Sequence, residues 1–273
     1  MVTAAKRLES PTSILTYLQC PRKYYYRYVK WLEQKPSIHL ITGGIAHSTI
    51  EAFHNTDITA IKPEGFFEKL QRKIMEQFNQ RWEEKKKEIE KLSLSPEEKH
   101  EHYDKTKMMI NNFYLYHTNK IIAYKHFYKL SLVEAYQKLK PKTETRLTSE
   151  KYGVRAVIDA IHDIDRETTI IDYKTSKKNE IDANCMLQLA ICSLLYKEKH
   201  GRMPNKAGIH FLRHGEKIIP TTYQLLSLAK RTCWKIHQAT NEEDITNYPK
   251  KTSGLCKYKT GQCDYYEKCI ERN

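Results

Sequence analysis

Apolar residues recur at helical spacing through most of the first half of the chain. A helix start at residues 10–13 leads into a helical pattern from 14 to about 32. After a break at Gly43-Gly44, the stretch IAHSTIEAFH predicts a short amphipathic helix. A long charged helix is predicted from 63 to about 91, and the Ser-Pro-Glu-Glu sequence at 95–98 begins another. The first half is therefore expected to be helical.

The pattern changes near residue 130, where short runs rich in β-branched residues appear. LSLVEAYQKL and KTETRL predict one or two strands, GVRAVIDAIHDI predicts another and TTIIDYK a third. A helix is then predicted from 181 to about 199, a strand at AGIHFLRHG, and a last helix from about 222 to 239. These elements predict an α/β (α+β) fold, with a mixed central β-sheet flanked by helices behind a helical N-terminal half.

The charge of the chain favours a polyanionic partner. Lysine and arginine number 47 against 33 acidic residues, which gives a net charge of +14. Clustered cations bind nucleic acid by displacing counterions from phosphates, although a soluble basic protein without such a partner has the same balance. The 19 tyrosines are open to the same two interpretations, because they can stack on unpaired bases or simply pack in the interior.

Neither a membrane span nor a secretory signal is predicted. No apolar run approaches the roughly 18 residues of a membrane helix, and the N-terminal sequence MVTAAKRLESP lacks the apolar core of a signal peptide. A cytoplasmic, reducing location is therefore expected. There, metal binding or burial explains the seven cysteines better than disulfides do.

The sequence TTIIDYKTSK places an acid and a base at the end of an apolar strand. Side chains two apart in a strand share a face, so Asp172 and Lys174 point the same way as Ile170. If the preceding strand forms a hairpin with this one, Asp159 converges on the same end of the sheet. Two carboxylates beside an ammonium suit a divalent cation. A surface ion pair is the alternative for an isolated Asp-x-Lys.

The combination of motifs resembles the RecB-like branch of the PD-(D/E)XK nuclease superfamily. The residues that carry the resemblance are Asp159 in RAVIDAI, Asp172 and Lys174 in IIDYKTS, and Gln188 in MLQLAICSLLY. Upstream, GGIAHSTIEAFH resembles the Gly-x-x-x-His helix of the family, and SPTSILTYLQCPRKYYYRYV resembles its N-terminal element. The resemblance implies a restriction-endonuclease-like sheet and metal-dependent hydrolysis of phosphodiester bonds.

The resemblance also implies roles for individual residues. His47, Asp159 and Asp172 would bind Mg²⁺ or Mn²⁺, Lys174 would position the attacking water, and Gln188 would brace the lysine or a phosphate. Two further acids, Glu51 and Glu144, are weaker candidates near the metal. The chain departs from the family at Cys192, where a tyrosine is common, and Tyr196 follows one turn later.

The tail GLCKYKTGQCDYYEKCIERN carries three cysteines that need a fourth ligand from elsewhere. Cys20, at the Cys-Pro position of the N-terminal element, is the candidate partner of Cys256, Cys263 and Cys269. Four thiolates can hold a [4Fe–4S] cluster or a zinc ion. The arrangement is similar to that of iron–sulfur members of the family, such as AddB and the CRISPR-associated exonucleases, so the cluster is favoured over zinc. It would hold the two chain ends together.

The remaining cysteines, Cys185, Cys192 and Cys233, are expected to be buried apolar residues.

Cations near these motifs are candidates for DNA binding. They lie in PRKYYYRYVKW and beyond the Asp-x-Lys strand: Arg22, Lys23, Arg27, Lys177 and Lys178.

Four segments are expected: N-terminal helices (1–55), a helical insertion over the DNA channel (56–130), the nuclease core (131–245) and the cysteine tail (246–273). The mixed charges of the insertion indicate a solvated helical surface.

The expected function is that of a DNA exonuclease acting on single strands or DNA ends. Repair or recombination, CRISPR adaptation and viral DNA processing would all use such a chain, with protein partners in a repair or CRISPR complex. Two alternatives stay open: a non-catalytic iron–sulfur module that binds DNA in a larger complex, and a zinc-stabilised RNA-processing protein.

Overall fold

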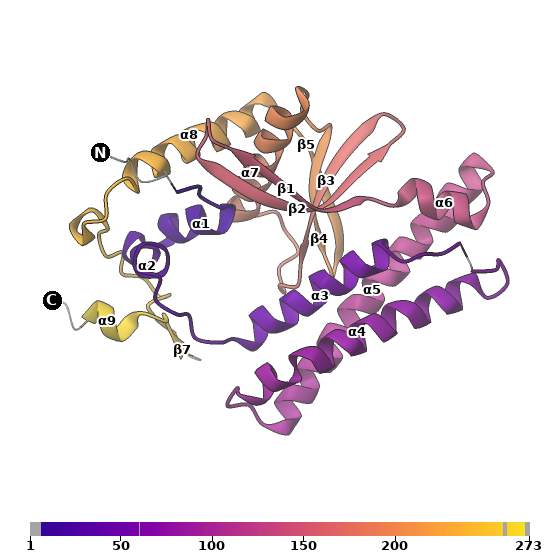
Figure 1. The fold of residues 1–273 in the computed structure, drawn as a ribbon, viewed down its shortest axis with the longest axis horizontal. Coiled ribbons are helices and arrows are strands. Elements are labelled where there is room, and N and C mark those ends of the chain that lie inside the picture. The colour runs from indigo at the N-terminus through magenta and orange to yellow at the C-terminus, as the bar shows by residue number, and fades with distance from the viewer. Residues whose placement is uncertain (1–6, 60, 259–260, 271–273) are drawn as a thin grey trace.

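A mixed five-stranded sheet forms the centre of the computed structural model, which describes residues 7–59, 61–258 and 261–270 (Figure 1). The strands lie in sequence order: β1 (Lys142–Ser149), β2 (Val154–Ile164), β3 (Glu167–Lys174), β4 (Lys206–Phe211) and β5 (Gly215–Pro220). Neighbours are antiparallel except β3 and β4, which are parallel and are joined through helix α7 (Ala183–His200). The prediction of a mixed sheet with flanking helices and a helical N-terminal half is confirmed.

The hairpin of β2 and β3 fixes which side chains face which side of the sheet. Its turn places Asp165 and Arg166 at positive φ, 52° and 67°, as tight hairpin turns require. Ile161 then pairs with Ile170. Ile170 packs on the α7 side of the sheet, whereas Tyr173 packs on the opposite side. Asp172 therefore belongs to the α7 side, as the alternation predicts.

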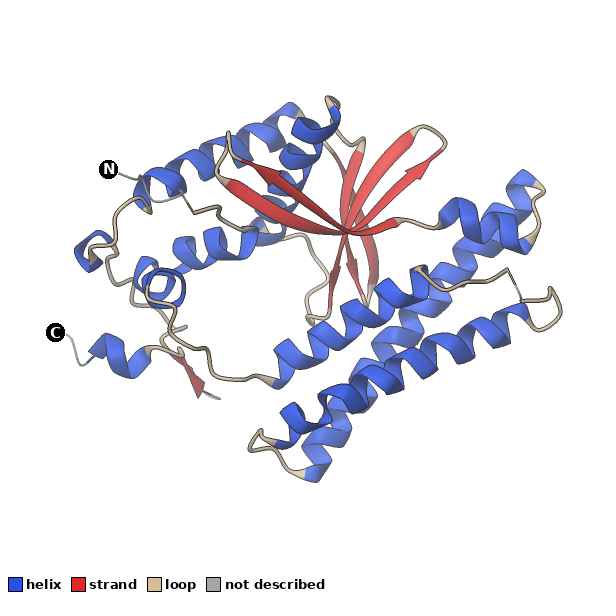
Figure 2. Cartoon of the chain, viewed as in Figure 1, coloured by secondary structure: helices blue, strands red, loops and turns tan. Residues whose placement is uncertain are grey.

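Three helices cover one face of the sheet (Figure 2). They are α1 (Pro11–Gln19), α7 and α8 (Tyr223–Ala239), and their apolar residues form one core with the strands. The opposite face is covered by α3 (Ile38–His54), α4 (Phe66–Glu90), α5 (Pro96–Tyr128) and α6 (Leu132–Leu139).

The helical segment 56–130 shares its core with the sheet. Phe78 of α4 and Phe113 of α5 belong to the same buried cluster as Ile171 and Tyr173 of β3. Deleting this segment would expose that apolar face of the sheet to water. The division of the chain into four segments stays a prediction.

Two predicted elements differ from the observed ones for different physical reasons. Helix α3 begins at Ile38 and runs through Gly43-Gly44 without a break. Two helical glycines cost only about 1 kcal/mol each relative to alanine, which tertiary packing offsets. The strand prediction for LSLVEAYQKL is wrong, because this stretch forms helix α6, which begins with a capping box of Ser131 and Glu134.

The helix predicted from 14 to about 32 is interrupted at Cys20. Its backbone is extended there, with φ −160° and ψ 112°, because a following proline disfavours the helical conformation. The chain continues as α2 (Pro21–Tyr24) and the π-helical turn η1 (Tyr25–Val29). At the other end of the sheet, the sequence pattern predicts the strand at AGIHFLRHG, which is β4, but it does not predict β5 as a separate strand.

The C-terminal tail folds back on the N-terminal element. It consists of the short elements η2 (Ile245–Asn247), β6 (Lys257–Tyr258), β7 (Gly261–Gln262) and α9 (Tyr266–Ile270). A cluster of buried tyrosines joins the two: Tyr24, Tyr25, Tyr26, Tyr248 and Tyr265. These tyrosines are packing residues.

Over the part of the chain that the structure describes, no helix is long and apolar enough to cross a membrane.

Candidate active site

The end of strand β3 carries a network of three polar side chains, here called the lysine network. Lys174 Nζ lies 2.8 Å from Asp172 Oδ2 and donates a 2.8 Å hydrogen bond to Gln188 Oε1 on α7. Gln188 Nε2 in turn donates to Asp172 Oδ1. One glutamine thus fixes the acid and the base together. The structure brings these three predicted site residues into contact.

The carboxylate of Asp172 is in an environment that disfavours its ionised form. Burial raises the pKa of Asp172 to about 6, although the Lys174 ammonium acts to lower it. Within the described ranges, the Lys174 ammonium at 2.8 Å is the one partner of the buried Asp172 Oδ2. A carboxylate oxygen that is buried with a single partner has lost most of its hydration, which costs free energy. A bound cation would remove that cost.

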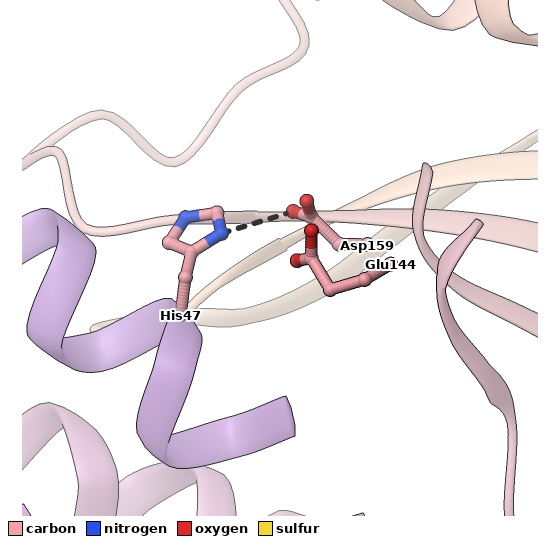
Figure 3. Close-up of side chains that lie close together, drawn as sticks. All are labelled: His47, Glu144 and Asp159. Carbon is pink, nitrogen blue, oxygen red and sulfur yellow. Dashed lines mark ion pairs between the residues drawn. The ribbon is translucent and has the colours of Figure 1, made fainter. Parts of the chain in front are cut away.

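Three further side chains converge next to the lysine network and are here called the donor group (Figure 3). His47 comes from α3, Glu144 from β1 and Asp159 from β2, and one ligand atom from each lies within 4.8 Å of the others. His47 Nδ1 is 3.3 Å from Asp159 Oδ2. The same oxygen accepts a 2.8 Å hydrogen bond from the backbone N–H of Tyr173. This bond ties the donor group to the strand that carries Asp172.

The charges of the donor group are concentrated. Burial lowers the pKa of His47, but the hydrogen bond to Asp159 and its charge outweigh this and hold that pKa above its ordinary value. Burial raises the pKa of Glu144, and the charges of Asp159 and Glu51 raise it further. Carboxylates gathered in this way repel one another when ionised, and a divalent cation relieves the repulsion.

The residues present fit a divalent cation. The donor group offers one imidazole and two carboxylates, and the buried Asp172 carboxylate, which is paired with Lys174, lies beside it. Carboxylates suit Mg²⁺ and Mn²⁺, while imidazole suits transition metals. The set is therefore chemically at least as suitable for Mn²⁺ as for Mg²⁺.

Sequence reasoning ranks Glu144 too low. It belongs to the close group, whereas Asp172 does not. The backbone of Glu144 has φ 46°, in the left-handed region that is uncommon for residues other than glycine. This conformation interrupts the regular pleat of β1. No spacing in KTETRL marks the residue, so the sequence carries no signal for it beyond its acidic type.

The aromatic positions around the site are structural. Tyr173 is buried, and its hydroxyl lies 3.1 Å from His54 Nε2 on the far side of the sheet. Cys192, where the resembled family has a tyrosine, is buried, and burial raises its pKa so that it stays a neutral thiol. Tyr196 is buried in the same core. Neither position reaches an open surface for substrate contact.

The predicted DNA-binding cations lie in different environments. Arg22 Nε donates a 2.7 Å hydrogen bond to the carbonyl of Tyr248, and Lys23 Nζ donates to Gln19 Oε1 at 3.2 Å. The Arg27 guanidinium lies over the ring of Tyr28, 4.9 Å from its centroid. Lys178 is paired with Asp182 in an exposed contact, and Lys177 lines a small cavity. Their nucleic-acid roles stay predictions.

Arg22 also holds the C-terminal tail, which gives a first testable prediction. Its second bond is donated to the carbonyl of Ile245, at 3.4 Å. Hydrogen bonds to charged groups contribute roughly 1.5–3 kcal/mol each. We expect Arg22→Ala to speed amide hydrogen exchange over residues 245–248, with Lys23→Ala as the matched control. Equal exchange rates in both variants would contradict this role.

The four cysteines predicted as cluster ligands line a single cavity of about 260 Å³. Cys20 lies at the junction of α1 and α2, and the other three come from the tail: Cys256, Cys263 and Cys269. Burial raises the pKa of the Cys269 thiol, and the nearby Cys20 and Cys256 contribute to the rise, whereas Lys250 and Arg22 lower it. The positive charges of Lys250 and Arg22 would therefore stabilise thiolate sulfurs in this cavity.

The fold and the site together define the class of α/β nucleases that carry acidic residues and a lysine at the end of central strands. Residues 9–269 match the family model described as the PD-(D/E)XK nuclease superfamily. The chain belongs to this superfamily, and a nucleic-acid substrate follows from that membership.

A solved structure shares this fold at low sequence identity. The chain is similar to a protein from Eubacterium rectale named "Putative exonuclease", at 13% identity and a TM-score of 0.51, with 98% of this chain and 89% of that one covered. A second similar structure, of SSO0001, has 16% identity and a TM-score of 0.30, and covers 53% of this chain and 77% of its own. No curated protein sequence matches the chain.

Proposed function

We propose that the chain is a metal-dependent DNA nuclease that hydrolyses phosphodiester bonds as an exonuclease, on single strands or at DNA ends. The observation that carries the proposal is the lysine network, with its buried Asp172 carboxylate, lying next to the donor group. The net charge of +14 favours a polyanionic substrate. The exonuclease assignment carried by the name of the Eubacterium rectale protein supports action at ends.

The chain's own residues supply positioning and proton handling. A divalent cation held by the donor group and Asp172 would polarise the scissile phosphate and lower the pKa of a bound water. An ammonium has three N–H donors, and the side chains of Asp172 and Gln188 engage two of those of Lys174. The third is free to orient the attacking water or to stabilise charge on a phosphoryl oxygen. Gln188 keeps the ammonium from rotating away.

A cleavage assay tests the proposal. We expect end-labelled single-stranded and duplex DNA to be degraded with Mn²⁺ or Mg²⁺, and circular single strands to survive because they have no end. EDTA should stop the reaction. Absence of cleavage on every DNA substrate, with binding retained, would identify a non-catalytic DNA-binding module instead. Preferential cleavage of matched RNA strands would identify an RNA-processing protein.

We also propose that the four cysteines hold a structural [4Fe–4S] cluster. Four sulfurs around one zinc, at Zn–S distances near 2.3 Å, lie only about 3.8 Å apart. Within the described residues, no three of these cysteine sulfurs lie within 4.8 Å of one another. This wider spacing around one cavity suits a multi-iron cluster better than a single ion. The cluster would join the tail to the N-terminal element, next to the buried tyrosines.

Removal of one ligand tests the cluster. We expect protein purified without oxygen to contain iron, inorganic sulfide and the broad visible absorbance of such clusters, and Cys269→Ser to lose most of all three. Cys233→Ala, which removes a buried thiol of α8 outside this cavity, is the control. Stoichiometric zinc without iron or sulfide would contradict the proposal and favour the zinc alternative.

For the pathway in which this activity would act, we propose three settings. A DNA exonuclease of this kind suits repair or recombination, CRISPR adaptation or viral DNA processing, alone or with protein partners. The neighbouring genes would distinguish these settings.

A further inference from the structure

A second cavity lies between the helical layer and the loop that follows β3. Its volume is about 150 Å³, and its basic lining residues come from α3, α5 and two loops: His39, His102, Lys105, Lys177 and Arg213. On the same measure a single water needs roughly 10–15 Å³, so the cavity has room for a larger polar group. The residues that line it carry no carboxylate. It is therefore a basic cavity.

The cavity has more basic groups than counter-charges. Lys105 forms an ion pair with Glu101, whose charge is also felt by His102 and Lys177. Neither Lys177 nor Arg213 forms an ion pair with an acid in the described part of the chain, and Arg213 Nε is engaged only with the carbonyl of Thr175, at 3.2 Å. The terminal guanidinium nitrogens, which form the fork that binds phosphate or carboxylate, are thus left for a ligand.

The geometry of the loop is fixed by contacts around the cavity. His214 Nε2 lies 3.1 Å from the carbonyl of Lys177, and the bond from Arg213 holds the carbonyl of Thr175. The rings of His39 and His102 meet edge to face with centroids 5.2 Å apart. Burial lowers the pKa of His102, and the nearby His39 and Lys105 lower it further, although Glu101 and Glu98 act to raise it. An anion in the cavity would offset this crowding of positive groups.

The cavity lies close to the candidate active site along both the chain and helix α3. Thr175 lines it and follows Lys174 in the chain. On α3, His39, Gly43 and His47 follow one another at four-residue spacing, so they form a slanted row along the helix. The two histidines are eight residues apart, which is about 12 Å along the helix axis. A strand whose scissile phosphate lies at His47 would reach the cavity within a few nucleotides.

Gly43 brings helix α3 close to the residue that follows Lys174. A Cβ added to Gly43 would lie 3.7 Å from Thr175 Oγ1, which is an ordinary van der Waals contact. The helix and the end of strand β3 are therefore neighbours at this point.

We propose that this basic cavity binds a phosphoryl group of the nucleic-acid substrate at a position away from the bond that is cut. The group is either a terminal phosphate or an internal backbone phosphate, and both present the same oxygens to Lys177 and Arg213. The proposal rests on the proposed nuclease function and adds a residue set that fixes where the strand enters. It makes Arg213, His39 and His102 substrate-positioning residues.

DNA binding without metal tests the site. We expect the double variant Lys177→Ala/Arg213→Ala, measured in EDTA, to bind a labelled single strand about tenfold or more weakly than the unmodified protein. The slope of log K against log salt should fall by about 0.7 for each phosphate that the variant no longer neutralises. The control Lys85→Ala/Lys86→Ala removes the same charge from the exposed face of α4. An unchanged affinity and salt slope in the double variant would overturn the site.

Strands with and without a terminal phosphate distinguish the two sources. A preference of the unmodified protein for 5′- or 3′-phosphorylated strands, abolished in the double variant, assigns the cavity to a terminal phosphate. A decrease of affinity that is equal for all strands assigns it to an internal phosphate.

A titration with inorganic phosphate separates this site from the proposed function. We expect saturable NMR shifts of the His39 and His102 ring protons, absent in the double variant. Saturation in a protein that neither binds nor cuts DNA would support the cavity and reject the nuclease function. Absence of saturation, with DNA cleavage intact and unaffected by the double variant, would reject the cavity alone.

Discussion

Asp172→Asn is expected to lower DNA cleavage at least about a thousandfold while the fold is retained. The change keeps the size of the side chain and an oxygen that can accept the Gln188 amide, but it removes the charge that faces Lys174 and the proposed metal. The ammonium then loses its ionic partner, and the buried oxygen no longer binds a cation strongly. The measurement is the single-turnover cleavage rate of an end-labelled strand with saturating Mn²⁺.

Stability separates this catalytic effect from unfolding. Burial raises the pKa of Asp172, so its ionised form is disfavoured in the folded protein at neutral pH. A neutral asparagine removes the cost of burying that charge, but it also leaves the Lys174 ammonium without its ionic partner. Because the two effects oppose each other, we expect a small change in melting temperature and a folded variant. Glu167→Gln, at the exposed start of the same strand, is the matched control and should cut normally. Wild-type cleavage by Asp172→Asn would refute the assignment of the active site.

The second large effect is expected on stability at acid pH. Four histidines surround a cavity of about 470 Å³ between the sheet and the helical layer: His54, His117, His162 and His210. Burial lowers the pKa of all four, to about 3 for His117 and about 4 for His162 and His210. The nearby Lys120 lowers the last three further, while Glu216 acts in the opposite direction on His162 and His210. His54 Nδ1 and His117 Nε2 also lack hydrogen-bond partners among the residues described.

The direction of the pH dependence follows from these pKa values. The unfolded chain binds protons at about pH 6.5, whereas the folded chain does not until about pH 4 or below. The free energy of unfolding therefore falls as the pH drops below 6.5. At pH 5 the loss is about 2 kcal/mol for each such histidine. Since net stabilities are commonly about 5–15 kcal/mol, several histidines together should bring the protein close to unfolding.

Urea denaturation between pH 7.5 and 5 measures this effect. We expect His117→Gln to reduce the slope of unfolding free energy against pH, even though it lowers stability at neutral pH. His100→Gln removes an exposed histidine whose side chain is 76% accessible and should leave the slope unchanged. Identical slopes in the wild type and His117→Gln would show that the buried histidines do not control acid stability.

The secondary structure is predictable where the sequence carries both periodicity and a boundary signal. Ser95 and Pro96 begin α5 as predicted, with a complete capping box. The apolar pattern misses helix α6 because it also fits a strand, although Ser131 and Glu134 carry the same capping signal. The interruption at Cys20 follows from Pro21, a local signal that the apolar pattern of the surrounding residues conceals.

The candidate site is predictable where residues are linked by local geometry. Asp172 and Lys174 lie on one face because strand side chains alternate, and Asp159 follows from the hairpin. Glu144 could not be placed, because its left-handed backbone breaks the alternation on which the prediction depends. Arg22 could not be assigned to the tail, because its partner carbonyls are more than 220 positions away in the chain.

The sequence by itself therefore determined the mixed sheet, the shared face of Asp172 and Lys174, and the resemblance to nucleases, because each depends on short periods and on motifs along the chain. Tertiary structure alone decided that Glu144 joins His47, that four histidines enclose one cavity, and that Lys177 and Arg213 meet His39 and His102 in another. These groups come from elements far apart in sequence. Their meeting depends on how the helical layer packs on the sheet, and no spacing along the chain records that packing.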